Sequence, residues 1–374
     1  MPIVWLKEPH AEKERFFQAI GESNGRALRT WPVSFQHFPE TNARAAACLA
    51  RAKKQPKSAV GYALKLAFLK GRYNWARRYF AAHPDDLALC WQGLTGTRRV
   101  FMEGARDAGA ARLFSELAPL PGYKTLDPEG VNAESSVPRV PSFFDDVTPD
   151  PALLDQIRGK LTARESRRKD VGQGQKRTTD CPYLFVPLQV PDDSQMVLFA
   201  GWVGSMEGFI NAIATAARDL PDGWHLRLKE HPSSRIRLTD QINALIADGA
   251  RLELDNETDS FAQLRASRGV LTCNSSMGLQ AMFHDVPVIT TGRCFYAMRG
   301  LTKHAGDAAT LRDLMGRAPA LQFDPEFRAR FLTWLAKDYY IGETEKGFDQ
   351  DAIKKRIAEA RACSGNPAPS AKSD

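Results

Sequence analysis

The segment LKEHP ends an apolar run with Lys229, Glu230 and His231, side chains that can bind an anion or move a proton. A histidine ring can donate one N–H to a phosphate while a neighbour holds its other nitrogen. Pro232 restricts the histidine backbone and disfavours its continuation into a helix. The alternative is a surface turn with a solvated histidine, and the dipeptide at His83 shows how readily this pattern arises.

The segment TCNSSMG places Asn274 directly after a second apolar run and Ser275 and Ser276 at the start of a predicted helix. A helix start presents unpaired N–H groups, and serine hydroxyls add hydrogen-bond donors. This arrangement suits a single phosphate group. Ordinary helix capping by asparagine and serine is the alternative.

Two further segments carry candidate residues. In PLQVPDDSQ, Gln189 and the pair Asp192 and Asp193 follow a strand-like run and can contact sugar or ribose hydroxyls, although such a pair also forms routine turns. Upstream, Glu116 follows the run RLFS, and Asp127 lies close to a glycine-containing turn. A carboxylate here can act as a base or a nucleophile, with Glu116 the first choice. The alternative is a solvated loop.

Some common motifs are absent from the sequence. It contains neither a phosphate-binding P-loop nor GxGxxG after the first strand of either half, which disfavours NTP hydrolysis and nicotinamide chemistry. The only Asp-x-Asp triplet, starting at Asp349, lies in a polar stretch near the C-terminus. The six cysteines show no CxxC pair or zinc-like spacing. We therefore expect no metal and no cofactor.

Strand-like and helix-like segments alternate between residues 183 and 318, with strands rich in Val, Leu and Ile. This rhythm predicts a parallel sheet with helices on both faces, and ligands bind beyond the carboxyl ends of such strands. A strand–helix–strand unit is expected at 87–114. The predicted divisions are an N-terminal α/β domain at 1–150, a linker with a polar helix at 151–182, a nucleotide-sugar-binding domain at 183–345, and a C-terminal helix with a disordered tail at 346–374.

Composition limits the class of protein. The 374 residues are 43% hydrophobic, and the sequence lacks both a secretory signal and an apolar stretch of membrane-spanning length. Scattered cysteines are typical of reduced core residues, so we expect a cytoplasmic protein. The net charge of +7 fits a phosphorylated donor or an anionic membrane or glycan, and no nucleic-acid motif is found. The basic, aromatic stretch 62–80 predicts either membrane contact or, preferably, a helix packed in the first domain.

Four of these segments together resemble the capsule polysaccharide biosynthesis family of bacterial β-Kdo glycosyltransferases. PLQVPDDSQ, KEHP and NSSMGLQA match motifs that follow one another in this family, and VPVITTGRCFY resembles its closing strand and Gly-aromatic segment. The stretches WQGLTGTRRVFMEGARDAG and SELAPLPGYKTLDPEGVNA are similar to its N-terminal half. The likeness extends over about residues 88–300.

The resemblance implies a GT-B-like α/β fold, with two Rossmann-like domains whose parallel sheets face a central cleft, and CMP-β-Kdo as donor. His231, Pro232, Ser275 and Ser276 fall on the CMP-binding motifs, which also include Gln189, Lys229, Glu230, Asn274 and Gly278. Glu116 falls on the catalytic carboxylate, although many members have an acidic pair followed directly by glycine. Here Leu117-Ala118-Pro119 follows instead.

The implied partners are a nucleotide-sugar donor, a lipid or glycan acceptor, and peripheral contact with the inner membrane and the capsule assembly machinery. Two other classes stay open. One is a GT-B-type transferase or epimerase that uses another nucleotide sugar. The other is a non-catalytic partner in polysaccharide assembly or export, for which no nucleotide would stabilise the fold.

Overall fold

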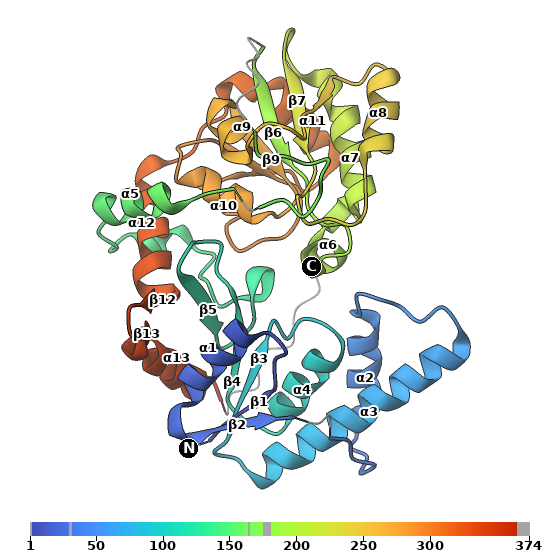
Figure 1. Ribbon diagram of the computed structural model, residues 1–374, viewed down its shortest axis with the longest axis vertical. Coiled ribbons are helices and arrows are strands. Elements are labelled where there is room, and N and C mark those ends of the chain that lie inside the picture. The colour runs from blue at the N-terminus through green and yellow to red at the C-terminus, as the bar shows by residue number, and fades with distance from the viewer. Residues whose placement is uncertain (1, 30–31, 164, 175–180, 365–374) are drawn as a thin grey trace. The chain divides into compact units, whose positions relative to one another are not determined.

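The computed structural model describes residues 2–29, 32–163, 165–174 and 181–364 (Figure 1). The chain forms two compact units. The first contains residues 1–118, 122–137 and 338–374, and the second contains 119–121 and 138–337. The chain therefore passes from the first unit to the second and returns for its final segment.

The first unit is built on a mixed seven-stranded sheet. Its strands, in spatial order, are β13 (Gly347–Phe348), β12 (Ile341–Thr344), β5 (Tyr123–Asp127), β4 (Arg112–Leu117), β3 (Leu87–Trp91), β1 (Ile3–Leu6) and β2 (Gly25–Leu28). The four strands from β4 to β2 are parallel, whereas β5 and β12 pair antiparallel to their neighbours. The sequence predicted only the β3–helix–β4 portion of this sheet.

Helices cover the sheet of the first unit in two groups. They are α1 (Ala11–Gly21), α2 (Thr41–Ala50), α3 (Ala59–Ala82), α4 (Gly96–Asp107) and α13 (Gln350–Ala362). Phe16 and Phe17 of α1 and Ile353 of α13 pack on alternate strand residues such as Leu89 and Trp91. Helices α2, α3 and α4 share a second cluster. The C-terminal helix is therefore part of the core of the first unit.

The second unit contains an all-parallel six-stranded sheet. Its strands, in spatial order, are β11 (Lys303–His304), β10 (Val288–Thr290), β9 (Gly269–Thr272), β6 (Tyr183–Pro187), β7 (His225–Lys229) and β8 (Leu252–Leu254). Counted from β6, this is the 3-2-1-4-5-6 order of dinucleotide-binding folds. The strand–helix alternation led us to expect a parallel sheet, and the structure shows that the chain reverses its direction across this sheet between β6 and β9.

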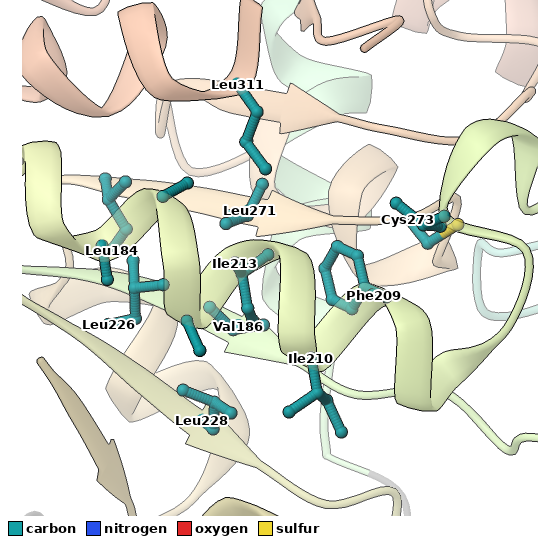
Figure 2. Packing of buried hydrophobic residues seen from close by; sticks show 14 of the residues in the cluster. Leu184, Val186, Phe209, Ile210, Ile213, Leu226, Leu228, Leu271, Cys273 and Leu311 are labelled. Atoms are coloured by element: carbon teal, nitrogen blue, oxygen red, sulfur yellow. The ribbon is translucent and has the colours of Figure 1, made fainter. Parts of the chain in front are cut away.

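Helices pack on this sheet, and α5 and α12 pack against each other. The helices of the unit are α5 (Pro151–Lys160), α6 (Ser194–Phe199), α7 (Met206–Ala216), α8 (Thr239–Ala247), α9 (Ser260–Ala266), α10 (Ser276–Met282), α11 (Ala308–Gly316) and α12 (Pro325–Trp334). Phe209, Ile210 and Ile213 of α7 pack on Val186 and Leu228 of the sheet (Figure 2). The apolar runs of the strands thus form the buried centre of the unit and hold the strand ends in fixed positions.

The boundary between the units lies elsewhere than the sequence predicted. The presumed linker 151–182 belongs to the second unit, because Val171 is buried and the N–H groups of Gly172 and Gly174 donate to carbonyls of the β8–α9 loop, at 2.7 and 2.8 Å. Residues 338–345 belong to the first unit through β12. The expected disordered tail falls mainly on residues 365–374, which lie outside the described residues.

The cysteines only partly follow the predicted pattern. None forms a disulfide; Cys48, Cys90 and Cys273 are buried, Cys294 is half-buried, and Cys181 and Cys363 are exposed. Within the described residues, no helix combines the length and the apolar character that crossing a membrane requires.

Candidate functional site

A pocket opens in the second unit at the carboxyl ends of β6, β7 and β9. Its lining comprises Thr162, Ala163, Gln173, Pro187, Leu188, Lys229, Glu230, His231, Pro232, Ser260, Phe261, Ser275, Ser276, Met277 and Gln280. It lies at the reversal point between β6 and β9, where open parallel sheets bind their ligands. The KEHP and NSS segments, 44 residues apart at His231 and Ser275, therefore meet in one cavity.

His231 is held in one tautomer by its own turn. The N–H of Ser233 donates to the ring Nδ1 of His231 at 3.1 Å. A neutral ring that accepts at Nδ1 carries its proton on Nε2. The carbonyl of Pro232 accepts from the N–H of Arg167 at 3.0 Å, which fixes the turn from the other side. The half-buried imidazole in the pocket lining thus carries its ring proton on Nε2 when it is neutral.

Ser275 and Ser276 form the start of α10. Ser275 is the N-cap: its Oγ accepts from the N–H of Met277 at 3.2 Å, and its own N–H donates to the hydroxyl of Thr272 at 3.2 Å. Ser276 is half-buried in the pocket lining. With only seven residues, α10 contributes little dipole, so the local N–H and hydroxyl groups carry the anion-binding capacity.

Gly278 lies beneath this helix start and is buried. A Cβ at this position would approach the hydroxyl oxygen of Tyr296 to 2.6 Å and Cγ2 of Thr272 to 3.1 Å. The Tyr296 hydroxyl donates to the carbonyl oxygen of Ser275. The absence of a side chain at Gly278 therefore leaves room for Tyr296, whose hydroxyl supports the N-cap residue Ser275. Gly278 thus affects the helix start through Tyr296.

Gln189 and Asn274 join the ends of the two strands at the reversal point. The side-chain amide of Gln189 donates to Oδ1 of Asn274 at 2.8 Å, and the backbone N–H of Asn274 donates back to Oε1 of Gln189 at 3.2 Å. The amide of Asn274 also donates to the carbonyls of Gln195 and Phe199, both at 3.1 Å. Both side chains are buried, and these bonds give them a positioning role.

Lys229 is saturated by backbone carbonyls. Its buried ammonium donates to the carbonyl oxygens of Gly172, Asn256 and Thr258, at 2.8, 3.0 and 2.8 Å. An ammonium group has three N–H donors, and all are used. Burial lowers the pKa of Lys229 to about 8. The side chain thus ties the β7 end to the 172–174 segment and has no donor left for a ligand.

Glu230 is likewise occupied. Its buried carboxylate accepts from the N–H of Leu238 at 2.6 Å, from Arg168 at 2.8 Å, from Thr239 at 2.9 Å and from Asn256 at 3.0 Å. Burial alone would raise the pKa of Glu230, but these bonds outweigh it and lower the pKa. The carboxylate fixes the 231–238 loop, so we assign it a structural role.

Several other pocket residues were not predicted from the sequence. Phe261 and Met277 supply apolar surface, and Oε1 of Gln173 accepts from the N–H of Ser260 at 2.9 Å. Thr162 and Ala163 come from the segment that the sequence placed in a linker. The buried Val171 was a signal that this segment belongs to a folded unit.

A second, strongly basic hollow is lined partly by residues that directly follow the His231–Pro232 turn. It is lined by Arg167, Arg168, Lys169, Asp170, Ser233, Ser234, Arg235 and Arg237. Five cations and one carboxylate make this surface attractive to an anion. Arg168 is held by Asp170 at 2.6 Å as well as by Glu230, so its guanidinium is fixed in place.

Glu116 belongs to the first unit, near the carboxyl end of β4. It is half-buried, and one carboxylate oxygen accepts from the N–H of Leu117 at 3.0 Å. Burial lowers the pKa of the nearby Lys13 ammonium, and the carboxylates of Glu8 and Glu116 partly offset this effect. Glu116 is therefore within electrostatic range of a lysine and a second carboxylate.

Glu8 and Lys13 are residues of this edge that sequence reasoning missed. Glu8 follows β1 and accepts from Arg98, with both oxygens 2.7 Å from the same nitrogen. The Lys13 ammonium lies 4.3 Å from the Trp91 ring centroid. The signal was the apolar run IVWL directly before Lys7 and Glu8, which is short enough to be overlooked.

Asp127, the second-choice catalytic carboxylate, is fully buried and bonded on both oxygens. Oδ1 accepts from the N–H groups of Glu129 and Gly130, at 2.8 and 2.9 Å. Oδ2 accepts from the N–H and hydroxyl of Ser136 and from the Tyr339 hydroxyl at 2.7 Å. This arrangement does not favour a catalytic role, and we describe Asp127 as the anchor of the 128–136 loop.

Among the described residues, no three His, Cys, Asp or Glu side chains gather in a way that could hold a metal ion. Two arginines whose guanidinium groups would suit an acidic sugar make contacts within the protein. Arg99 pairs with Glu103 and Glu134 at 2.7 and 2.8 Å, and Arg139 donates to the carbonyl of Phe295 at 2.9 Å.

Comparison with known proteins agrees with this geometry. Residues 153–324 match the family model described as capsule polysaccharide biosynthesis protein. Protein FixF of Sinorhizobium fredii (strain NBRC 101917 / NGR234) is 28% identical over 313 residues, covering 78% of this chain and 72% of FixF. The capsule polysaccharide export protein KpsS of Escherichia coli is 23% identical over 283 residues, covering 61% of this chain and 72% of KpsS.

A solved structure shares the fold. It is Thermosulfurimonas dismutans KpsC, beta Kdo 2,7 transferase, with a TM-score of 0.55, 12% sequence identity, and coverage of 96% of this chain and 99% of the other. This likeness confirms the GT-B-like α/β fold. Residues 153–324 are thus similar to the capsule polysaccharide biosynthesis family, and both sequence relatives extend the similarity beyond this range.

Proposed function

We propose that the protein is a glycosyltransferase of capsular or related surface polysaccharide synthesis that transfers Kdo from CMP-Kdo to a lipid or glycan acceptor. The observation that carries the proposal is the pocket at the β6–β9 reversal, which brings the His231 imidazole together with Ser275 and Ser276. The relatives add support, since they are described by capsule polysaccharide synthesis and export and the solved structure by Kdo transfer.

The pocket suits a nucleoside monophosphate. The Nε2–H of His231 and the donors at the start of α10 address one phosphate group, and Phe261, Met277 and Pro232 offer apolar surface to a base. Stabilising the negative charge that develops on departing CMP lowers the barrier to breaking the glycosidic bond. A single phosphate carries less charge than a diphosphate, so the proposed reaction needs no metal ion.

An acidic sugar fits the charge of the neighbouring basic hollow. Guanidinium groups pair well with carboxylates, and the hollow adjoins the turn that presents His231. We assign Arg235 and Arg237, which come from the same loop as His231, to the attraction of an acidic sugar.

Glu116 is the proposed catalytic carboxylate. It either takes the proton from the attacking acceptor hydroxyl or attacks the anomeric carbon to form a covalent glycosyl adduct, as retaining glycosidases do. Its position near the carboxyl end of a strand, within electrostatic range of Lys13, supports this role.

A nucleotide panel tests the proposal. We expect CMP, and not UDP, ADP or GDP, to raise the melting temperature of the protein. At about 100 times its Kd, one bound ligand stabilises a protein by about 2.7 kcal/mol. Preference for UDP or ADP would favour a transferase or epimerase that uses another donor. No stabilisation by any nucleotide would favour the non-catalytic alternative and contradict the proposal.

A further inference from the structure

The positive charge of the protein is concentrated in one segment. Residues 41–84 contain ten lysines and arginines and no aspartate or glutamate. The whole chain has a net charge of only +7, so the remainder is net negative. This segment forms α2, the following loop and α3 of the first unit (Figure 1). The basic character that the composition left unexplained thus belongs to a single structural feature.

The arginines and the lysines of this segment behave differently. Arg44 pairs with Asp107 at 2.8 Å and Arg51 with Glu134 at 2.6 Å, so both hold the unit together. Lys53, Lys54 and Lys57 in the α2–α3 loop are exposed. Within the described part of the chain, no ion pair is found for these three lysines. Their charge is directed to solvent.

The first half of α3 carries an exposed apolar stripe beside these lysines. Val60, Leu64 and Phe68 are 70%, 68% and 42% exposed. A spacing of four residues places all three on one face of the helix. From Leu69 onward the helix turns buried residues such as Tyr73 into the unit. The stripe therefore lies on the exposed part of α3.

The stripe continues onto a neighbouring loop. The N–H of Ser34 donates to the carbonyl of Gly71 at 2.9 Å, which places the 33–35 segment against α3 one turn beyond Phe68. Val33 is exposed there, and Phe35 is 96% exposed. Large apolar side chains grouped in this way mark an interaction surface.

The surface is held in place by the fold. Ser58 caps α3 by accepting from the N–H of Gly61 at 3.1 Å, and Lys65 donates to the carbonyl of Lys54 at 2.6 Å. Gln55 donates to the carbonyls of Leu49 and Ala52, at 3.0 and 3.1 Å, and closes the end of α2. The lysine loop is thereby fastened to the helix that bears the apolar stripe.

We propose that this surface, formed by Val33, Phe35, the lysines of the α2–α3 loop, and Val60, Leu64 and Phe68 of α3, docks the protein on an anionic membrane. An interfacial helix binds by inserting apolar side chains at the headgroup boundary while flanking lysines face anionic lipids. The charge of residues 41–84 is complementary to anionic lipids, because this segment contains lysines and arginines but no acidic residue that would repel the headgroups. The proposal is independent of the donor site in the second unit.

Vesicle flotation tests the proposal on the full chain. We expect binding to phosphatidylcholine vesicles that contain phosphatidylglycerol, little binding to phosphatidylcholine alone, and weakening at high salt. Lys53→Glu/Lys54→Glu/Lys57→Glu should reduce affinity for the anionic vesicles about 100-fold. Leu64→Gln/Phe68→Gln should reduce it about tenfold or more at unchanged charge, because insertion of the apolar side chains is lost.

Matched variants in other exposed places serve as controls. Lys303→Glu/Lys346→Glu/Lys354→Glu changes the net charge equally, and Val140→Gln/Val197→Gln removes comparable apolar surface from the second unit. Both should bind vesicles like the wild type. Melting temperature and CMP stabilisation verify that each variant is folded.

If the control variant Lys303→Glu/Lys346→Glu/Lys354→Glu lost as much affinity for anionic vesicles as the loop variant, net charge alone would explain binding. That result would overturn the proposal. Absence of vesicle binding by the wild type would do the same and would point to an acidic protein as the occupant. Because CMP binding is measured separately, failure of the donor proposal would leave this test intact.

Discussion

At the scale of single residues, the motifs divide by the bonds that their side chains already make. All three N–H donors of the Lys229 ammonium form hydrogen bonds to backbone carbonyls, and the carboxylate of Glu230 accepts from four groups. The ring of His231 lines the pocket, and its Nδ1 accepts from the N–H of Ser233 in the same turn. The sequence placed the three together at one strand end, but only the structure separates the proposed ligand contact from its supports.

The role of His231 gives the first prediction. His231→Asn removes the Nε2–H donor, and we expect turnover of CMP-Kdo to fall about 100-fold or more. The melting temperature without ligand should change little, because the ring is half-buried in a pocket lining. Steady-state kinetics and thermal unfolding measure the two effects. A variant with wild-type turnover would remove His231 from the mechanism.

Glu116 and Asp127 give a paired prediction. Glu116→Gln should lower turnover by at least about 100-fold with little change in stability, because glutamine keeps the size and shape of this half-buried side chain. Asp127→Asn should cost about 3 kcal/mol of stability, because a buried acceptor of five bonds is disrupted. Thermal unfolding and CMP release distinguish the two, and the reverse pattern would exchange their roles.

At the scale of elements, the strands and helices of the second sheet largely matched the sequence, because each strand is an apolar run of its own. The short β1 and the antiparallel β12 and β13 were missed, since two to four residues carry almost no periodic signal. The 151–174 segment was taken for a linker because it is mostly polar, and its buried Ile157, Leu161 and Val171 are too widely spaced to form a clear pattern.

The packing beneath α10 gives an element-scale prediction. Gly278→Ala should displace Tyr296, cost about 1–3 kcal/mol of stability, and weaken CMP binding through the shifted helix start. Tyr296→Phe alone removes the bond to Ser275 and should cost about 1 kcal/mol. In the double variant the two effects should be less than additive, because the missing hydroxyl makes room for the new Cβ. Strict additivity would contradict this packing account.

Glu230 gives a pH-dependent prediction. Its folded-state pKa is lowered, so its contribution is complete above the unfolded pKa and is lost as pH falls through the folded pKa. Glu230→Gln should therefore be less stable than wild type by about 3 kcal/mol at pH 7. The difference in the free energy of unfolding between the two proteins should decrease below about pH 4, where the wild-type carboxyl also becomes protonated. Denaturant titrations from pH 7 to below pH 4 measure this difference. A difference that stays constant with pH would exclude the charge of Glu230 as its cause.

At the scale of the whole molecule, the chain returns to the first unit after residue 337. Ile341, Phe348 and Ile353 enter the core of that unit, and Tyr339 bonds Asp127. The sequence indicated a C-terminal helix but not its destination, because nothing in its pattern specifies which of two apolar cores it joins.

This return gives a truncation prediction. Removing residues 338–374 should unfold the first unit and leave the second unit folded and stabilised by CMP, since the pocket lies wholly within the second. Hydrogen exchange followed by peptide mass spectrometry locates the loss of protection. Protection retained throughout 1–118 would contradict the assignment of the C-terminal segment to that core.

The most direct measurement is transfer itself. The full chain is incubated with CMP-Kdo and a lipid acceptor, with and without EDTA, and CMP release and the Kdo-bearing product are followed by mass spectrometry. We expect a Kdo-bearing product whose formation EDTA does not suppress and which the variants His231→Asn and Glu116→Gln both fail to form. Transfer from a UDP- or ADP-sugar with none from CMP-Kdo, or wild-type rates in both variants, would contradict this expectation.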